Sequence, residues 1–142
     1  MKLNIKSFKD RIWESLPFIF VFVVSLYKPF DSDLGWHLKY GEYFFQHLSP
    51  LRVNTFSTEM SGFPWINSSW GTHLISYLAY HYFGFVGLSV LASLVITATL
   101  WFFAKAFKLD FFSKALTFPL VLYFLYPINV VSFRGQLLSL MF

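Results

Sequence analysis

Two carboxylates and an imidazole follow the first apolar run of the sequence at short spacing. Asp31 and Asp33 are separated by one residue, and His37 comes four residues after Asp33. Two carboxylates placed in this way can share a cation, or one of them can act as a general base. Residues four apart on a helix share a face, so Asp33 and His37 can also pair in proton transfer or in contact with a substrate phosphate. This segment therefore predicts a site for acid–base chemistry.

A structural explanation of the same residues stays open. Asp33 precedes a helical pattern, where an aspartate can cap the first turn and its charge is favoured by the helix dipole. Spacing alone favours this explanation, because a D-x-D pair has little specificity, and both explanations can hold together. The other histidines, His47, His73 and His81, form no i, i+4 pair and no H-x-x-E-H motif, so no metal ligands are assigned. The cofactor stays open, with a divalent cation as one candidate.

The elements that carry these residues are expected to belong to a membrane protein. Hydrophobic residues make up 56% of the 142-residue chain and charged residues 13%, outside the usual range of soluble domains. Phenylalanine contributes 20 residues, and its side chain suits lipid because it needs no hydrogen-bond partner. The absence of cysteine excludes disulfides, thiolate metal sites and cysteine nucleophiles. The net charge of +4 comes from basic residues at the ends of apolar runs, a pattern of membrane topology and not of nucleic-acid binding.

The predicted fold class is all-α, a polytopic transmembrane helical bundle with about three full spans. A spanning helix needs roughly 20 mostly apolar residues. The candidate spans are residues 12–30, 85–104 and 115–131. Residues 132–142 begin another apolar run, which predicts an outer turn and the start of a further span. We therefore expect a single membrane domain that is the N-terminal fragment of a longer protein.

Residues 31–84 are expected to form a loop on the outer side of the membrane. Apolar residues at helical spacing over residues 34–48 predict a short interfacial helix, which Pro50 ends. Residues 68–83 are apolar but short, and they carry two histidines. We interpret them as a second, partial or interfacial helix.

Lysine and arginine positions set the predicted orientation. Basic residues gather in residues 1–11 and 105–114, and the positive-inside rule places both segments in the cytoplasm. The predicted location is the plasma membrane of a prokaryote, with a cytoplasmic N-terminus. Arg134 then lies on the same outer face as Asp31 and Asp33. A complete crossing by residues 68–83 would invert every later segment.

Several short motifs follow one another in an order that resembles a known family. The motifs are Asp31-x-Asp33-x-x-Trp36-His37-Leu38-x-x-Gly41, Pro50, Asn54-x-Phe56-Ser57, Gly62-x-Pro64-Trp65 and Arg134-Gly-Gln136. Together they resemble the N-terminal part of the polytopic GT-C-type membrane glycosyltransferases, in particular members related to the protein mannosyltransferase and lipid A aminoarabinose transferase group. The resemblance covers about residue 30 to the last residue.

The resemblance implies roles for individual residues. An acidic residue of the first outer loop acts at the catalytic centre of that family, which implies Asp33 as the base and Asp31 as the second candidate. Arg134 is the candidate contact for a donor phosphate, because its planar guanidinium can bind two oxygens. The other candidate substrate-binding residues are His37, Lys39, Arg52 and Trp65.

The predicted function is transfer of a sugar from a polyprenyl-phosphate donor to an acceptor on the extracytoplasmic side. Membrane lipids and the lipid-linked donor are the expected partners, nucleic acid is not, and the oligomeric state stays open. The enzyme assignment applies to the full-length parent, and the fragment alone is expected to be inactive. The alternative is a non-enzymatic multi-pass membrane protein, such as a transporter segment or an assembly subunit. A transporter more typically places ionisable residues within its spans, and residues 85–104 and 115–131 contain none.

Overall fold

The computed structural model describes residues 5–27, 29, 31–65 and 67–131. In this part of the chain the protein is all-helical, which confirms that part of the predicted fold class. The helices are α1 (Ile5–Val24), α2 (Leu34–His47), α3 (Trp70–Ala106) and α4 (Phe111–Val131). The one extended pairing in the described ranges is an isolated antiparallel bridge between Val53 and Pro64.

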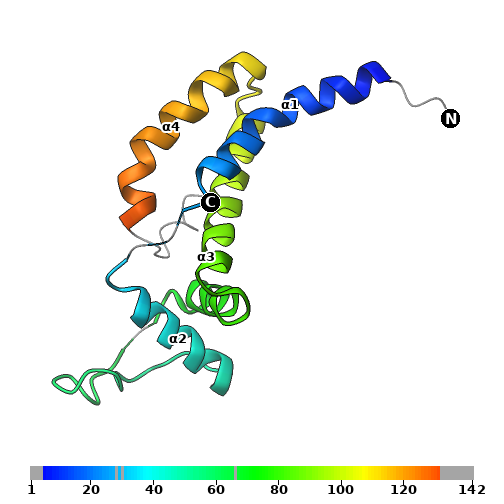
Figure 1. The fold of residues 1–142 in the computed structure, drawn as a ribbon. Helices are drawn as coiled ribbons and strands as arrows, with labels where there is room; N and C mark the ends of the chain where they lie inside the picture. The colour runs from blue at the N-terminus through cyan, green and yellow to red at the C-terminus, as the bar shows by residue number, and fades with distance from the viewer. Residues whose placement is uncertain (1–4, 28, 30, 66, 132–142) are drawn as a thin grey trace.

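A kink at Gly84 divides α3 into two parts. Gly84 has φ 60° and ψ −148°, a combination that is open to glycine and strained for other residues. Figure 1 shows that residues 70–83 and residues 85–106 run in clearly different directions. The first part carries His73 and His81, whereas the second part has Lys105 as its one charged residue. The apolar segment of α3 therefore begins after the kink.

The prediction of about three full membrane spans is wrong. Within the described residues, α3 is the one helix long and apolar enough to cross a membrane. The apolar stretches described in α1 and α4 are shorter, between 10 and 17 residues long: Ile12–Val24 and Phe111–Phe124. Helices of that length reach at most roughly 25 Å, whereas the hydrocarbon core of a bilayer is about 30 Å thick. Composition suggested longer spans, but α1 stops being helical after Val24. The predicted start of a further span at residues 132–142 lies outside the described residues.

The helices pack in two groups at opposite ends of the molecule (Figure 1). At one end, α1 and α4 pack with the second part of α3 around a core of buried apolar residues: Val21, Ile96, Leu100, Ala104 and Phe118. At the other end, α2 packs against α3 around Leu34, Leu88 and Ala92. Apolar burial of this kind is the main source of stability in each group. Asp31, Asp33 and His37, which the sequence predicts to carry chemistry, lie directly before or within α2 and therefore belong to the second group.

Candidate functional site

The two predicted carboxylates lie in a turn, residues 31–33, directly before α2. Asp31 Oδ1 accepts the backbone N–H of Asp33 at 2.9 Å, and the Ser32 hydroxyl donates to Asp33 Oδ1 at 3.5 Å. Asp33 occupies the N-cap position of α2, but its side chain makes no capping hydrogen bond. Capping therefore does not account for the Asp33 carboxylate. Both aspartates are half-buried, so their carboxylates are partly shielded from water. We call residues 31–33 the acidic turn.

One turn into α2, His37 meets a histidine from α3. His37 Nδ1 lies 3.0 Å from His73 Nε2, and one ring donates its N–H to the lone pair of the other. The rings also stack, with 4.8 Å between their centroids and 28° between their planes. The two residues are 36 positions apart in the sequence. We call them the histidine pair.

His73 is the buried member of the histidine pair. Its exposed fraction is 6%, and it lies before the Gly84 kink, outside the apolar part of α3. Burial, and secondarily the neighbouring His37, lower the pKa of His73 from 6.5 to about 4. His73 Nδ1 is also buried and has no hydrogen-bond partner among the described residues. His73 is therefore neutral near pH 7.

A column of stacked rings connects the histidine pair to the loop after α2. Tyr40 stacks on His73 with 5.5 Å between centroids, and Trp65 stacks on Tyr40 with 6.1 Å. Phe56 packs against Tyr40 at 5.5 Å. Burial raises the pKa of Tyr40, because the desolvated phenolate is disfavoured. The column therefore runs from His37 through His73 and Tyr40 to Trp65, a residue that is 41% exposed.

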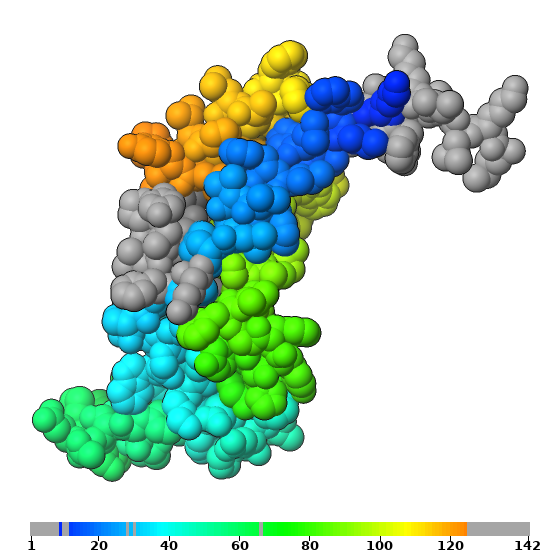
Figure 2. Space-filling view, viewed as in Figure 1, coloured from blue at the N-terminus to red at the C-terminus, as the bar shows by residue number. Residues whose placement is uncertain are grey.

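The loop at residues 51–65 presents Trp65 through a short hairpin-like pairing. The Trp65 N–H donates to the Arg52 carbonyl at 2.8 Å, and the Asn54 N–H donates to the Phe63 carbonyl at 2.9 Å. Asn54 Oδ1 also accepts the N–H groups of Phe56 and Ser57, each at 3.2 Å. Figure 2 shows this loop projecting from the body at the lower left. The backbone pairing fixes the base of the loop, where Trp65 meets α2.

The remaining predicted substrate contacts lie apart from the acidic turn or cannot be placed. Lys39 forms an ion pair with Glu42 at 2.6 Å. Both line an open groove of about 390 Å³ between α2 and α3, together with Gly35, Leu38, Tyr77, Tyr80 and His81. Arg52 is exposed at the base of the loop. Arg134 lies outside the described residues.

The structure therefore groups Asp31 and Asp33 in one turn. It also joins His37 to Trp65 through Tyr40 and His73, two residues that the sequence analysis did not assign to a site. A signal for His73 is present in the sequence, because an imidazole within an apolar helical stretch needs a polar partner when buried. The identity of that partner has no local signature.

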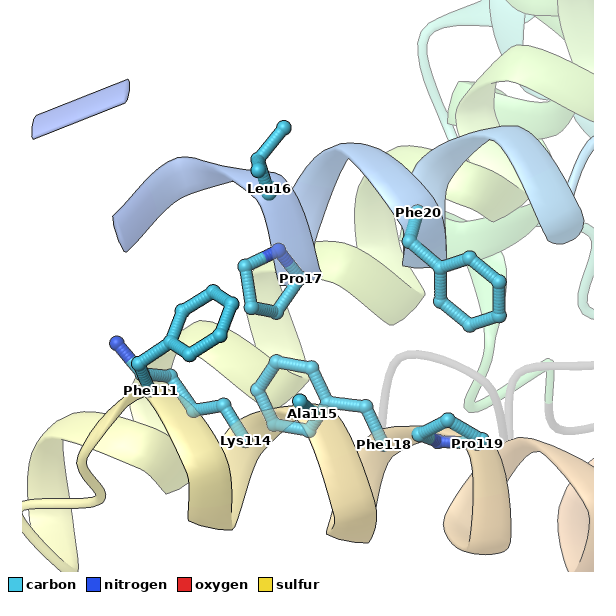
Figure 3. Close-up of a pocket in the computed structure, with 8 residues that line it drawn as sticks. All are labelled: Leu16, Pro17, Phe20, Phe111, Lys114, Ala115, Phe118 and Pro119. Carbon is cyan, nitrogen blue, oxygen red and sulfur yellow. The ribbon is translucent and has the colours of Figure 1, made fainter. Parts of the chain in front are cut away.

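A second ionisable pair lies at the other end of the molecule, between α1 and α4. The Lys114 ammonium is buried, forms an ion pair with Glu14 and lies 5.6 Å from the centre of the Phe18 ring. The sequence predicts Lys114 in a cytoplasmic connection, whereas in the structure it belongs to the first turn of α4. Figure 3 shows Lys114 at a cleft of about 240 Å³ whose other lining residues are apolar: Leu16, Pro17, Phe20, Phe111, Ala115, Phe118 and Pro119. This cleft contains none of the predicted chemical residues.

No metal ligand set is evident in the described ranges, where no group of three or more His, Asp or Glu side chains is arranged to hold an ion. No protein-family model, no curated protein and no solved structure matches the chain. The acidic turn, the histidine pair and the stacked column are therefore the features from which a function must be argued.

Proposed function

We propose that this chain carries the acceptor-activating part of a GT-C-type membrane glycosyltransferase, which moves a sugar from a polyprenyl-phosphate donor to an acceptor on the extracytoplasmic side. The observation that carries the proposal is the acidic turn. Its Asp33 carboxylate stands at the start of α2 without capping the helix and accepts a hydrogen bond from the Ser32 hydroxyl at 3.5 Å. The Asp31 carboxylate accepts the Asp33 N–H. A general base needs such an oriented, partly shielded carboxylate near its substrate.

In the proposed reaction, the Asp33 carboxylate takes the proton of an acceptor hydroxyl. The acceptor oxygen then bonds to the anomeric carbon of the donor sugar, while the bond from that carbon to the phosphate oxygen breaks. Polyprenyl phosphate leaves with the electron pair of that bond. Cationic groups stabilise the negative charge on the departing phosphate, and Arg134 stays the predicted residue for this role.

The proposed membrane segment is residues 85–106, the apolar part of α3 after Gly84. The acidic turn, α2 and residues 70–83 would then lie at the membrane surface, within reach of a donor whose lipid tail is in the bilayer. Three partly exposed indoles support this position, because tryptophan is enriched at the membrane–water interface. They are Trp36, Trp65 and Trp70.

Trp65 is the proposed contact for a sugar ring. Its indole is partly exposed, and it is backed by Tyr40 in the stacked column. A rigid, amphipathic aromatic surface offers contact area at a small cost in conformational entropy. The column also links this surface to the helix that begins at the acidic turn.

The test is a transfer assay on the protein expressed from its complete gene in its own membranes. Radiolabelled polyprenyl-phosphate sugar is supplied, and label on the acceptor is measured. We expect Asp33→Asn to lower the rate by about 100-fold or more, as for loss of a general base. Asp31→Asn should have a smaller effect, because an amide oxygen can still accept the Asp33 N–H.

Glu59→Gln is the matched control, since it removes a carboxylate from the exposed part of the loop at residues 51–65. It should leave the rate unchanged. Undiminished transfer in both aspartate variants would reject the carboxylate assignment. Absence of transfer by the unaltered protein, with every donor sugar tried, would favour the non-enzymatic alternative.

A further inference from the structure

The open groove between α2 and the first part of α3 has the size of a ligand site. Its volume is about 390 Å³, near the lower end of the roughly 300–1,000 Å³ of small-molecule sites. One face of α2 lines it with residues three and four positions apart: Gly35, Leu38, Lys39 and Glu42. The residues of the acidic turn and of the stacked column do not line it. We call this space the α2–α3 groove.

Two opposite charges line the α2–α3 groove. The Lys39 ammonium lies 2.6 Å from Glu42 Oε2, and the two side chains are 60% and 30% exposed. An ion pair that is open to water contributes little to stability, so its charges can turn to a ligand at small cost. Because the two charges cancel, they give no net attraction to a ligand that is only anionic. A ligand with one charge of each sign can satisfy both side chains.

Three rings line the α2–α3 groove from α3: Tyr77, Tyr80 and His81. Tyr77 and His81 stack with 5.4 Å between their centroids, and Phe45 packs against Tyr77 at 5.8 Å. Tyr80 meets the Phe85 ring edge-on at 5.3 Å. These contacts orient the rings before a ligand binds, which lowers the entropic cost of binding. Phenol rings attract cations to their faces, so tyrosines near a carboxylate suit an ammonium group.

The α2–α3 groove lies next to the proposed membrane segment, residues 85–106. Leu38 and Tyr80 line the groove and also pack against the cluster that contains Leu88 and Ala92 of that segment. Figure 1 shows α2 beside the bend of α3. A ligand in the groove would therefore lie at the depth of lipid headgroups. Exposed apolar side chains of the segment, such as Val86, leave acyl chains a surface to follow.

We infer that the α2–α3 groove binds the headgroup of a zwitterionic phospholipid, with the lipid phosphate on Lys39 and the lipid ammonium on Glu42 and the tyrosine rings. Each charge of the headgroup then meets a side chain of opposite charge. A phosphate alone would be repelled by Glu42, and a neutral sugar headgroup would compensate neither charge. The inference rests on the membrane segment in the proposed function, but not on sugar transfer.

The first test is native mass spectrometry of the unaltered chain in detergent micelles, titrated with one lipid at a time. The three lipids share their acyl chains and differ in headgroup: phosphatidylethanolamine, phosphatidylglycerol and a monoglucosyl diacylglycerol. We expect phosphatidylethanolamine to bind about tenfold more tightly than either of the others, because they lack the ammonium that the carboxylate and the rings contact. Equal affinity for the three lipids, or a preference for the anionic or the sugar lipid, would overturn the inference.

The second test reverses the charge balance of the groove. Glu42→Gln removes the partner of the lipid ammonium and leaves the Lys39 charge. We expect this variant to bind phosphatidylethanolamine more weakly and phosphatidylglycerol more tightly than the unaltered chain does. Glu59→Gln is the matched control, since it removes an exposed carboxylate from the loop at residues 51–65, and it should keep the original preference. An unchanged preference in Glu42→Gln, or an equal loss of affinity for both lipids, would count against the groove.

The third test fills the groove with a side chain. Gly35 lines the groove, and nothing lies within 4 Å of a Cβ built there, so a side chain can start at this position without a clash. We expect Gly35→Leu to lose at least about tenfold in affinity for phosphatidylethanolamine, with an unchanged midpoint of thermal unfolding. Gly71→Leu is the control, because its position is equally open but does not line the groove, and it should bind like the unaltered chain.

Full affinity of Gly35→Leu for phosphatidylethanolamine would show that the lipid binds elsewhere. If Gly35→Leu does not fold, the headgroup preference of Glu42→Gln decides. None of these measurements depends on sugar transfer, so failure of the lipid site and failure of the proposed function can be told apart.

Discussion

Gly41 lies directly against the backbone of His73. A Cβ built on Gly41 would be 2.1 Å from the His73 carbonyl oxygen and 2.5 Å from the Tyr77 Cβ. Real Cβ atoms do not approach other atoms so closely, so α2 docks in its observed position only because residue 41 has no side chain. This contact places His37 within hydrogen-bond distance of His73.

Gly41→Ala should therefore weaken the docking of α2. We expect a loss of about 1–3 kcal/mol in the free energy of unfolding, the usual range for overpacking a tight contact. Thermal unfolding in nanodiscs and hydrogen exchange of the α2 amides would measure it. Gly35→Ala is the control, because nothing lies within 4 Å of a Cβ there and alanine favours a helix. Equal stability of both variants would show that α2 is not docked as described.

Gly84→Ala should destabilise the chain by straining the kink in α3. Position 84 has φ 60° and ψ −148°, and a non-glycine residue there costs about 1–3 kcal/mol. No atom lies within 4 Å of a Cβ at this position, so the loss would come from backbone strain and not from a clash. Gly71→Ala, in the same helix with ordinary dihedral angles and open space, should not lower stability. The measurement is the midpoint of thermal unfolding, and an unchanged midpoint in Gly84→Ala would contradict the kink.

Removal of Glu14 should leave the buried Lys114 ammonium without its partner. We expect Glu14→Gln to cost about 1 kcal/mol, less than for a fully buried pair, because the Glu14 side chain is 55% exposed and water screens it. The double variant Glu14→Gln with Lys114→Met should recover stability, since methionine suits the apolar cleft. Denaturant unfolding of the unaltered protein, the single variants Glu14→Gln and Lys114→Met, and the double variant gives the coupling energy. A coupling energy of zero would show that the pair contributes nothing.

Asp110 should make the start of α4 sensitive to acid. Hydrogen bonding by the Ser113 side chain, and secondarily by the Ser113 N–H, which the carboxylate accepts at 2.8 Å, lowers the pKa of Asp110 below its usual 3.8. The stabilisation is complete above the usual pKa and is lost as the pH falls through the lowered value. Asp110→Asn keeps an acceptor oxygen and should remove this pH dependence. Hydrogen exchange at Ser113 between pH 5 and pH 2 measures the effect, and identical profiles in both proteins would exclude it.

Local features of the sequence predicted α2 well. The helix expected over residues 34–48 is observed as Leu34–His47, and Leu48 ends it in the left-handed conformation with φ 51°. Apolar periodicity and the nearby Pro50 are local signals, so their prediction does not depend on the rest of the fold. The positions of Asp31 and Asp33 directly before this helix were predictable for the same reason. The N-cap position considered for Asp33 is confirmed, although its side chain makes no capping hydrogen bond.

The number of long apolar helices was predicted wrongly from composition. Hydropathy records how apolar a run is, but not where its helix ends or bends. The described apolar stretch of α1 stops at Val24, and α3 contains both the separate helix expected at residues 68–83 and the apolar run after it. The bend between them depends on the conformation of Gly84, which periodicity does not encode.

The sequence by itself determined the helical class, the extent of α2 and the acidic turn at its start. Only the tertiary structure decided that His37 bonds to His73 and that Tyr40 stacks between His73 and Trp65. His37 and His73 are 36 residues apart, and their contact requires α2 to dock on α3 through Gly41. Helical periodicity relates residues three or four apart on one helix, whereas the partners of a buried imidazole are chosen by the packing of different helices.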